Sequence, residues 1–219
     1  MSAESGILAV ARQRMVAEAD GIRAAAEAVD TTFVHAASLI LTCEGKLFVG
    51  GSGTSGTVAR RMAHILSVTG TPAVAFSPMD SLHGSSGAIT ATDLVLLISN
   101  GGASAEVIES ARIVQRRGAR VIALTRSHTT PLARLADLSV AVAVDARAEL
   151  GGVVATGITL AQSAWGDALA EVLMRGRGYR WQQFMDTHPA GAVGQLEDLP
   201  PDPPPLPIPA LASIEGARR

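Results

Sequence analysis

Short uninterrupted apolar runs alternate with longer segments of mixed polarity through the middle of the chain. The apolar runs are Lys46–Gly50, Ala73–Phe76, Leu94–Ser99, Arg120–Thr125 and Leu138–Val144. Continuous apolar strands are typical of parallel sheets that are covered on both faces. We therefore expect an α/β fold with a parallel sheet. Helix-length segments between most of the runs predict helices at Ser55–Val68, Ser104–Arg117 and, shorter, Pro131–Ala136.

The two ends of the chain have other patterns. Residues 3–42 are rich in Ala and Leu with spaced charges, which predicts two helices separated near Gly21 or the segment that begins at Asp30. A longer helix is expected at Thr156–Arg175. Residues 199–209 contain seven prolines, which excludes a helix or a central strand and predicts an extended or disordered segment.

We expect one domain over residues 1–198, with N-terminal helices in 1–43 and an α/β core and C-terminal helix in 44–198. Residues 199–219 are expected to be a disordered proline-rich tail. Hydrophobic residues make up 47% of the chain, enough for a sizeable core. The net charge of −2 and the 3% of aromatic residues argue against nucleic-acid binding.

Cys43 is the only cysteine, so an intramolecular disulfide and a cysteine-based zinc site are excluded, and we expect a small buried hydrophobe there. No metal site and no cofactor are expected. The N-terminus lacks a signal-peptide pattern, and the apolar stretches are shorter than the ~20 residues that span a bilayer. We therefore expect a cytoplasmic protein without a membrane partner.

Two Gly/Ser turns follow apolar runs and precede predicted helices. They read GSGTSG at residues 51–56 and SNGGAS at residues 99–104. Ligands of open α/β sheets bind beyond the carboxyl ends of the strands, where helix N-termini favour anions. Both turns therefore predict an anion site at that edge of the sheet.

The first turn satisfies G-x-G-x-x-G. A dinucleotide site also requires an acidic residue about 20 positions later, at the end of the second strand, to bind the ribose hydroxyls. Asp80 lies beyond Pro78 and is poorly placed, and the absence of a lysine after Gly56 excludes a P-loop. A hydroxyl-rich turn suits a single phosphate monoester, and a turn that binds nothing is the alternative. The hydroxyls are those of Ser52, Thr54, Ser55 and Thr57.

A series of motifs carries a resemblance to a known family. They are GSGTSG, TGTPAVAFSPMDSLHG, DLVLLISNGGASAE, LARLADLSVAV, GDALAEVL and FMDTHPAGAVG. The chain resembles the SIS (sugar isomerase) domain, and within it the arabinose-5-phosphate isomerases, over roughly residues 5–195. The resemblance implies a three-layer fold with a five-stranded parallel sheet flanked by helices and preceded by two N-terminal helices. The proline-rich segment stands where that group often has a CBS pair.

The resemblance implies that the two turns hold the phosphate of a phosphosugar, with Ser55, Ser99 and Ser104 as its main contacts. Gly101 stands where the family often has a serine, so one hydroxyl is missing. Ser99 as an ordinary strand-end serine is the alternative. The residues expected to bind phosphate or substrate are Ser52, Gly53, Thr54, Ser55, Ser99, Asn100, Gly101, Ser104, Arg147 and Thr156.

Conversion of an aldose to a ketose through an enediol needs a base, a ring-opening group and donors for the developing oxyanion. The resemblance implies Glu106 as base or positioning group, His188 at the ring oxygen and His83 on the sugar hydroxyls. It also implies that His188 reaches a neighbouring subunit's site in a homotetramer. Each has a structural alternative: histidines in loops are often structural, and the helix dipole stabilises a carboxylate at Glu106 regardless of chemistry.

Three family positions are changed. Thr54 replaces a lysine, Ser85 an aspartate, and Arg147 a glutamate that is a candidate base. Glu149 and Asp145 flank Arg147 and could replace that glutamate. If all three changes line the pocket, it is more positive than the family's, and a phosphosugar with a second acidic group is expected to bind Arg147. The alternative is that Arg147 points to solvent.

The preferred function is a phosphosugar aldose–ketose isomerase with a shifted substrate. The alternative is a non-catalytic SIS module that binds a phosphosugar as a signal, which the lost lysine and glutamate favour and the retained His188 motif opposes. A third reading is a partner-binding protein whose proline tail docks an aromatic groove as polyproline II. The sequence does not name the sugar, and it leaves the base open among Glu106, Glu149 and Asp145.

Overall fold

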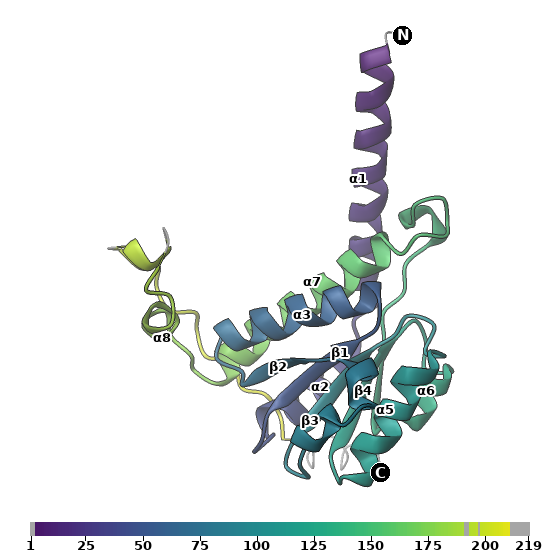
Figure 1. Cartoon of the computed structure of the whole chain (residues 1–219). Helices are drawn as coiled ribbons and strands as arrows, with labels where there is room; N and C mark the ends of the chain where they lie inside the picture. Colours follow the sequence, from purple (N-terminus) through teal and green to yellow (C-terminus); the bar gives the residue numbers. More distant parts are fainter. Residues whose placement is uncertain (1–2, 191–192, 197, 211–219) are drawn as a thin grey trace.

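Five parallel strands form one sheet in the order β2-β1-β3-β4-β5 (Figure 1). The computed structural model describes residues 3–190, 193–196 and 198–210. The strands are β1 (Leu47–Gly51), β2 (Ala73–Phe76), β3 (Leu94–Ile98), β4 (Arg120–Thr125) and β5 (Leu138–Ala141). The prediction of a parallel α/β sheet is confirmed, and each strand lies on one of the five apolar runs.

Helices cover both faces of the sheet. One face carries α2 (Thr31–Leu41), α3 (Thr54–Val68) and α7 (Gly157–Gly176), and the other carries α5 (Ala105–Arg116) and α6 (Pro131–Leu135) (Figure 1). Alternate residues of a strand enter different layers: Leu96 packs in the first core and Leu97 in the second, and neither is exposed. Burial on both faces is why the strands read as continuous apolar runs.

The N-terminal segment forms two helices that separate at Asp30 and not at Gly21. α1 (Ala3–Glu27) runs through Gly21, and α2 begins after Asp30, whose carboxylate accepts the Thr32 N–H at 2.8 Å. Gly21 is buried, and a Cβ there would lie 2.9 Å from Cβ of Ala148, so this glycine lets the 145–156 loop pack against α1.

The N-terminal half of α1 projects away from the body (Figure 1). Ile7 is 70% exposed and Val10 is 69% exposed on this arm. Within the described residues, no single helix is long and apolar enough to cross a membrane. α1 and α2 taken together reach the required length and composition, but the chain bends by 79° between them.

Beyond α7 the chain forms α8 (Trp181–Asp186), which the sequence pattern does not predict. Residues 199–210 are extended and pack on the chain itself: Ile208 joins the main core, and the Leu206 N–H donates to the Arg175 carbonyl at 3.4 Å. An extended segment is one of the two expected alternatives, and the expected disorder of 199–219 stays a prediction; residues 211–219 lie outside the described residues. The boundaries of the single domain stay a prediction.

Shorter helices are α4 (Pro78–Ser81), η1 (Ser85–Ala88), η2 (Ala146–Ala148) and η3 (Val193–Gln195).

Asp93 ties together the starts of two neighbouring strands. Its carboxylate accepts the Lys46 N–H at 2.7 Å, the Thr90 N–H at 2.7 Å and the Thr90 hydroxyl at 2.8 Å. Burial alone would raise the pKa of Asp93, but these hydrogen bonds outweigh it and hold the pKa below its ordinary value.

Asp93→Asn is therefore expected to lower the free energy of unfolding at pH 7 by about 1–3 kcal/mol. Because the ionised form is stabilised, this contribution is complete above the ordinary carboxyl pKa of about 3.9 and is lost as the pH falls through the native pKa. Urea unfolding of both proteins from pH 7 to pH 3 checks it. The exposed Asp198→Asn is the control, and a wild-type-to-variant difference that stays constant with pH would contradict the assignment.

Candidate functional site

The two Gly/Ser turns lie side by side because β1 and β3 are neighbours in the sheet. Gly51 pairs with Ile98, so Ser52 and Ser99 leave the sheet at the same level. The helices that follow, α3 and α5, cover opposite faces. The chain continues from β1 to β2 on one side of this pair and from β3 to β4 on the other side. The carboxyl edge of β1 and β3 is therefore the topological switch point, where ligands of such sheets bind.

The first turn is held in one shape by close backbone contacts. A Cβ on Gly51 would lie 2.8 Å from the carbonyl carbon and oxygen of Ser55, and Gly53 has a positive φ of 56°. The Ser52 hydroxyl is buried and has no hydrogen-bond partner among the described residues. The Thr57 hydroxyl donates to the Thr54 carbonyl at 2.7 Å and is used within the helix. Ser52, Thr54 and Ser55 are therefore the hydroxyls left for a ligand.

The second turn is fixed against the start of α6. The Gly102 N–H donates to the Ser99 carbonyl at 3.1 Å, and a Cβ on Gly102 would meet Thr130. The Asn100 backbone carbonyl accepts the Arg126 N–H at 3.0 Å. Ser104 precedes α5 without making a capping hydrogen bond, so its hydroxyl also remains available.

A cavity of about 290 Å³ lies beside the first turn, lined by Ser52, Gly53, Arg60, Phe76, Ser77 and Met79 among others. Arg60 reaches it because helical side chains tilt toward the helix N-terminus, and its guanidinium lies 3.8 Å from where a Cβ of Gly56 would be. Among the described residues, no acidic residue lines the cavity. Sequence reasoning missed Arg60, although its position four residues after the last glycine of the turn could have indicated it.

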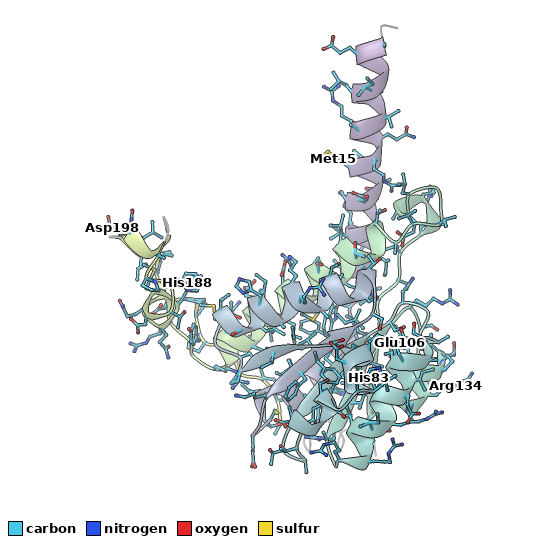
Figure 2. The ribbon with its side chains drawn as sticks, viewed as in Figure 1. Met15, His83, Glu106, Arg134, His188 and Asp198 are labelled. Carbon is cyan, nitrogen blue, oxygen red and sulfur yellow. The ribbon has the colours of Figure 1, made fainter. Side chains whose placement is uncertain are left out.

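One of the predicted catalytic residues, Glu106, lies at this edge of the sheet. Glu106 is half-buried in the first turn of α5, and its carboxylate has no hydrogen bond or ion pair to the described residues. His83 is exposed just after α4, which packs against α5. Figure 2 shows both side chains on the same side of the molecule. The fold thus places a free carboxylate next to the second turn, and the approach of His83 to the same site stays a prediction.

His188 lies at the other end of the molecule, beyond α8 (Figure 2). Its ring stacks on Phe184 with centroids 3.9 Å apart, and its Nδ1 lies 2.8 Å from the Phe184 carbonyl oxygen. Because that oxygen can only accept, Nδ1 is the donor, and Nε2 carries the lone pair of the neutral ring. Within one chain, His188 is not brought to Glu106.

Arg147 and Thr156 belong to the 145–156 loop between β5 and α7. The Arg147 side chain is 89% exposed and forms an ion pair with Asp145 at 2.9 Å. It lines a different cavity, of about 630 Å³, together with Gln13 and Arg14 of α1. The Thr156 hydroxyl accepts the Leu150 N–H at 3.2 Å, a contact within the loop. Their roles in substrate binding stay predictions.

The SIS domain profile matches residues 40–172, which is more than half of the chain. The chain belongs to the SIS domain family. An Escherichia coli protein solved in complex with arabinose 5-phosphate has a TM-score of 0.83 and 28% identity, and the match covers 86% of this chain and all of that one. A putative sugar-phosphate isomerase of Listeria monocytogenes has a TM-score of 0.82 and 30% identity, with 87% and 100% covered. The resemblance and the fold inferred from it are confirmed.

Curated SIS relatives include two arabinose 5-phosphate isomerases. KdsD of Pseudomonas aeruginosa is 32% identical over 195 residues, which cover 89% of this chain and 60% of the relative. GutQ of Escherichia coli is 34% identical over 188 residues, which cover 86% and 59%. The chain therefore spans about three fifths of the length of the curated relatives it matches.

The carboxylate of Glu149, one of the candidate bases, caps the N-terminus of α7 in this SIS domain. It accepts the N–H groups of Thr156, Gly157 and Ile158 at 2.7, 3.0 and 3.3 Å. These are among the backbone donors that a helix leaves unsatisfied at its start. Asp145 is also engaged: hydrogen bonds from the Arg147 N–H and guanidinium lower the pKa of Asp145, which weakens it as a base.

Glu149→Ala is expected to lower the free energy of unfolding by about 1–3 kcal/mol, because three donors at the start of α7 lose their acceptor. Asp145→Ala, at an exposed position of the same loop, is the matched control and is expected to leave stability nearly unchanged, because solvent screens interactions of exposed charges. Urea unfolding of the three proteins measures both. Equal stability of the two variants would contradict the role of Glu149 as a cap of α7.

Proposed function

We propose that this SIS domain is a phosphosugar aldose–ketose isomerase that acts through an enediol. The observation that carries the proposal is the unpaired Glu106 carboxylate beside two anion-binding turns at the sheet's switch point. The names of the curated relatives and the complex of the Escherichia coli neighbour with arabinose 5-phosphate support a substrate of this class. No metal or cofactor is part of the proposal.

In this mechanism the turns bind the phosphate and Glu106 moves the proton. Backbone N–H groups at the starts of α3 and α5, with the hydroxyls of Ser55, Ser99 and Ser104, fix one end of the sugar. Glu106 removes the proton from C2 of the aldose, exchanges it in part with solvent and delivers a proton to C1 of the enediol, while the hydroxyl proton passes from O2 to O1. His83 binds the sugar hydroxyls. Glu149 and Asp145, both engaged elsewhere, are the weaker candidates for the base.

His188 completes the site of a second subunit. Its Nε2 carries the lone pair needed to exchange a proton with the ring oxygen, but within its own chain it is remote from Glu106 (Figure 2). The projecting arm of α1 exposes Ile7, Val10 and Met15, apolar side chains that a second copy would bury. We propose a homotetramer in the cytoplasm in which each site takes His188 from a neighbour.

Arg60 supplies positive charge next to the first turn, where the family's lysine is replaced by Thr54. Arg60→Ala is expected to raise the KM for the phosphosugar by about tenfold to a hundredfold, because a charge-assisted hydrogen bond to phosphate is lost. Arg61→Ala is the matched control, since Arg61 instead pairs with Asp167 at 2.7 Å. An equal KM for both variants would contradict this role for Arg60.

A more anionic substrate remains part of the proposal, with Arg147 as the expected contact for its second acidic group. Arg147→Ala should then weaken binding of acidic phosphosugars selectively. The second candidate function is a non-catalytic phosphosugar sensor. It is favoured by Thr54 and Arg147, which stand where the family has its lysine and its candidate base.

Proton NMR in deuterated water separates the two functions. The purified protein is incubated with arabinose 5-phosphate, ribulose 5-phosphate, hexose 6-phosphates and acidic analogues. An isomerase exchanges the carbon-bound proton of one sugar for deuterium, and Glu106→Gln abolishes the exchange. Absence of exchange with every sugar, together with a rise in melting temperature with one of them, would establish the sensor.

A further inference from the structure

Two aromatic rings of α8 hold His188 in place. The His188 ring stacks on Phe184 at an interplanar angle of 23°, and Phe184 meets Trp181 edge-on, with centroids 6.1 Å apart. The Phe184 carbonyl also accepts the His188 Nδ1–H. The position of the imidazole therefore depends on Phe184, and the position of Phe184 depends on Trp181.

Trp181 is in turn held by the proline-rich segment. Its indole Nε1–H donates to the Pro201 carbonyl at 3.1 Å, and its backbone N–H donates to the Asp202 carboxylate at 2.9 Å. Both N–H groups of Trp181 thus bind residues about twenty positions away in the sequence. Asp202 takes the place of an N-cap residue for α8, and the N-cap residue itself, Arg180, offers no such acceptor.

The proline-rich segment is itself fixed to the body of the SIS domain. The Arg175 guanidinium donates to the Pro204 carbonyl at 3.0 Å, and Ile208 packs in the main core. Gly176 of α7 leaves the space that Ile208 occupies, since a Cβ on Gly176 would collide with the Ile208 side chain. Prolines suit such a segment because their fixed φ leaves less conformational entropy to lose when the chain docks.

We infer that residues 199–210 form a brace that positions His188 through Trp181 and Phe184. This inference rests on the proposed function, in which His188 serves the site of a neighbouring subunit. The proline-rich segment then has a structural role within its own chain, because the Pro201 and Pro204 carbonyls accept hydrogen bonds from Trp181 and Arg175. It binds an aromatic residue of the same protein and not an aromatic groove of a partner. Trp181 and Asp202 are positioning residues, because they act on the reaction only through His188.

Asp202→Ala and Trp181→Phe test the brace in the full chain. The first removes the acceptor of the Trp181 backbone N–H, and the second removes only the indole donor while an aromatic ring stays. Each is expected to lower kcat by about tenfold to a hundredfold with KM nearly unchanged, because a misplaced catalytic group costs rate and not ground-state binding. Asp202→Asn retains an acceptor oxygen and should restore kcat, and Asp198→Ala is the matched acidic control.

A spectroscopic readout keeps this test separate from the proposed function. Proton–nitrogen NMR of the imidazole rings, assigned with His188→Ala, reports the tautomer and environment of His188 without any substrate. Asp202→Ala and Trp181→Phe are expected to shift the His188 resonances and to mix its tautomers, while Asp198→Ala leaves them in place. Unchanged resonances in both variants would overturn the brace. Shifted resonances in a protein that isomerises no sugar would support the brace and contradict the proposed function.

Discussion

Mixing the His188→Ala and Glu106→Gln variants is expected to restore isomerase activity that neither variant has alone. Each substitution removes a proton-transfer group, so each homo-oligomer should lose about 10²- to 10⁴-fold in kcat. If a site combines Glu106 of one subunit with His188 of another, a mixed oligomer contains some sites with both groups intact. Random assembly of equal amounts gives about a quarter of such sites in a closed symmetric oligomer.

The measurement is the initial rate of isomerisation after the two variants are unfolded together and refolded, or co-expressed with different tags. The two variants refolded separately and then combined without subunit exchange are the control, and they should stay inactive. A mixed preparation as inactive as its components would contradict a shared site. Figure 2 shows His188 and Glu106 in different parts of the same chain, so such a result would also remove His188 from the proposed site.

Gly51→Ala is expected to disrupt the first turn more than any other single methyl group near the site. The added Cβ would lie 2.8 Å from backbone atoms of Ser55 and 3.0 Å from the Ile98 carbonyl oxygen, and backbone cannot move aside as a flexible side chain can. Either the start of α3 or the β1/β3 pair must shift. We expect the free energy of unfolding to fall by about 1–3 kcal/mol and phosphosugar binding to weaken at least tenfold.

Gly101→Ala is the matched control for this prediction. Gly101 lies in the second turn, where an added Cβ would meet no atom within 4 Å and where φ is not positive. Urea unfolding and thermal shift with the phosphosugar found by NMR measure both variants. Similar results for Gly51→Ala and Gly101→Ala would mean that the first turn tolerates displacement and does not depend on the close approach of its backbone.

The sheet could be predicted because each strand is buried on both faces and leaves an uninterrupted apolar run in the sequence. The path of the two ends of the chain could not be predicted from the sequence. Gly21 has the sequence signature of a helix break but fills a packing role against Ala148. The α8 helix is only six residues long, and the acceptor of its first N–H group, Asp202, comes from a segment whose prolines indicated disorder.

The two turns of the candidate site could be found from sequence, since parallel strands deliver their carboxyl ends to one edge. The hydrogen bonds of Glu149 could not be predicted, because its three donors lie seven to nine residues on, where an irregular loop ends and α7 begins. Arg60 was missed for another reason: its charge reads as an ordinary helix surface until the fold places it beside a cavity free of acids.

The projecting arm of α1 has a consequence for how this protein reaches its final shape. Isolated helices of this length are marginal in water, and most helices in proteins depend on tertiary packing for their stability. The outer half of α1 finds little such packing on its own chain (Figure 1). In the proposed homotetramer we therefore expect its helical order to depend on protein concentration, because dilution that separates the subunits would leave the arm without packing, and assembly would be the last step of folding.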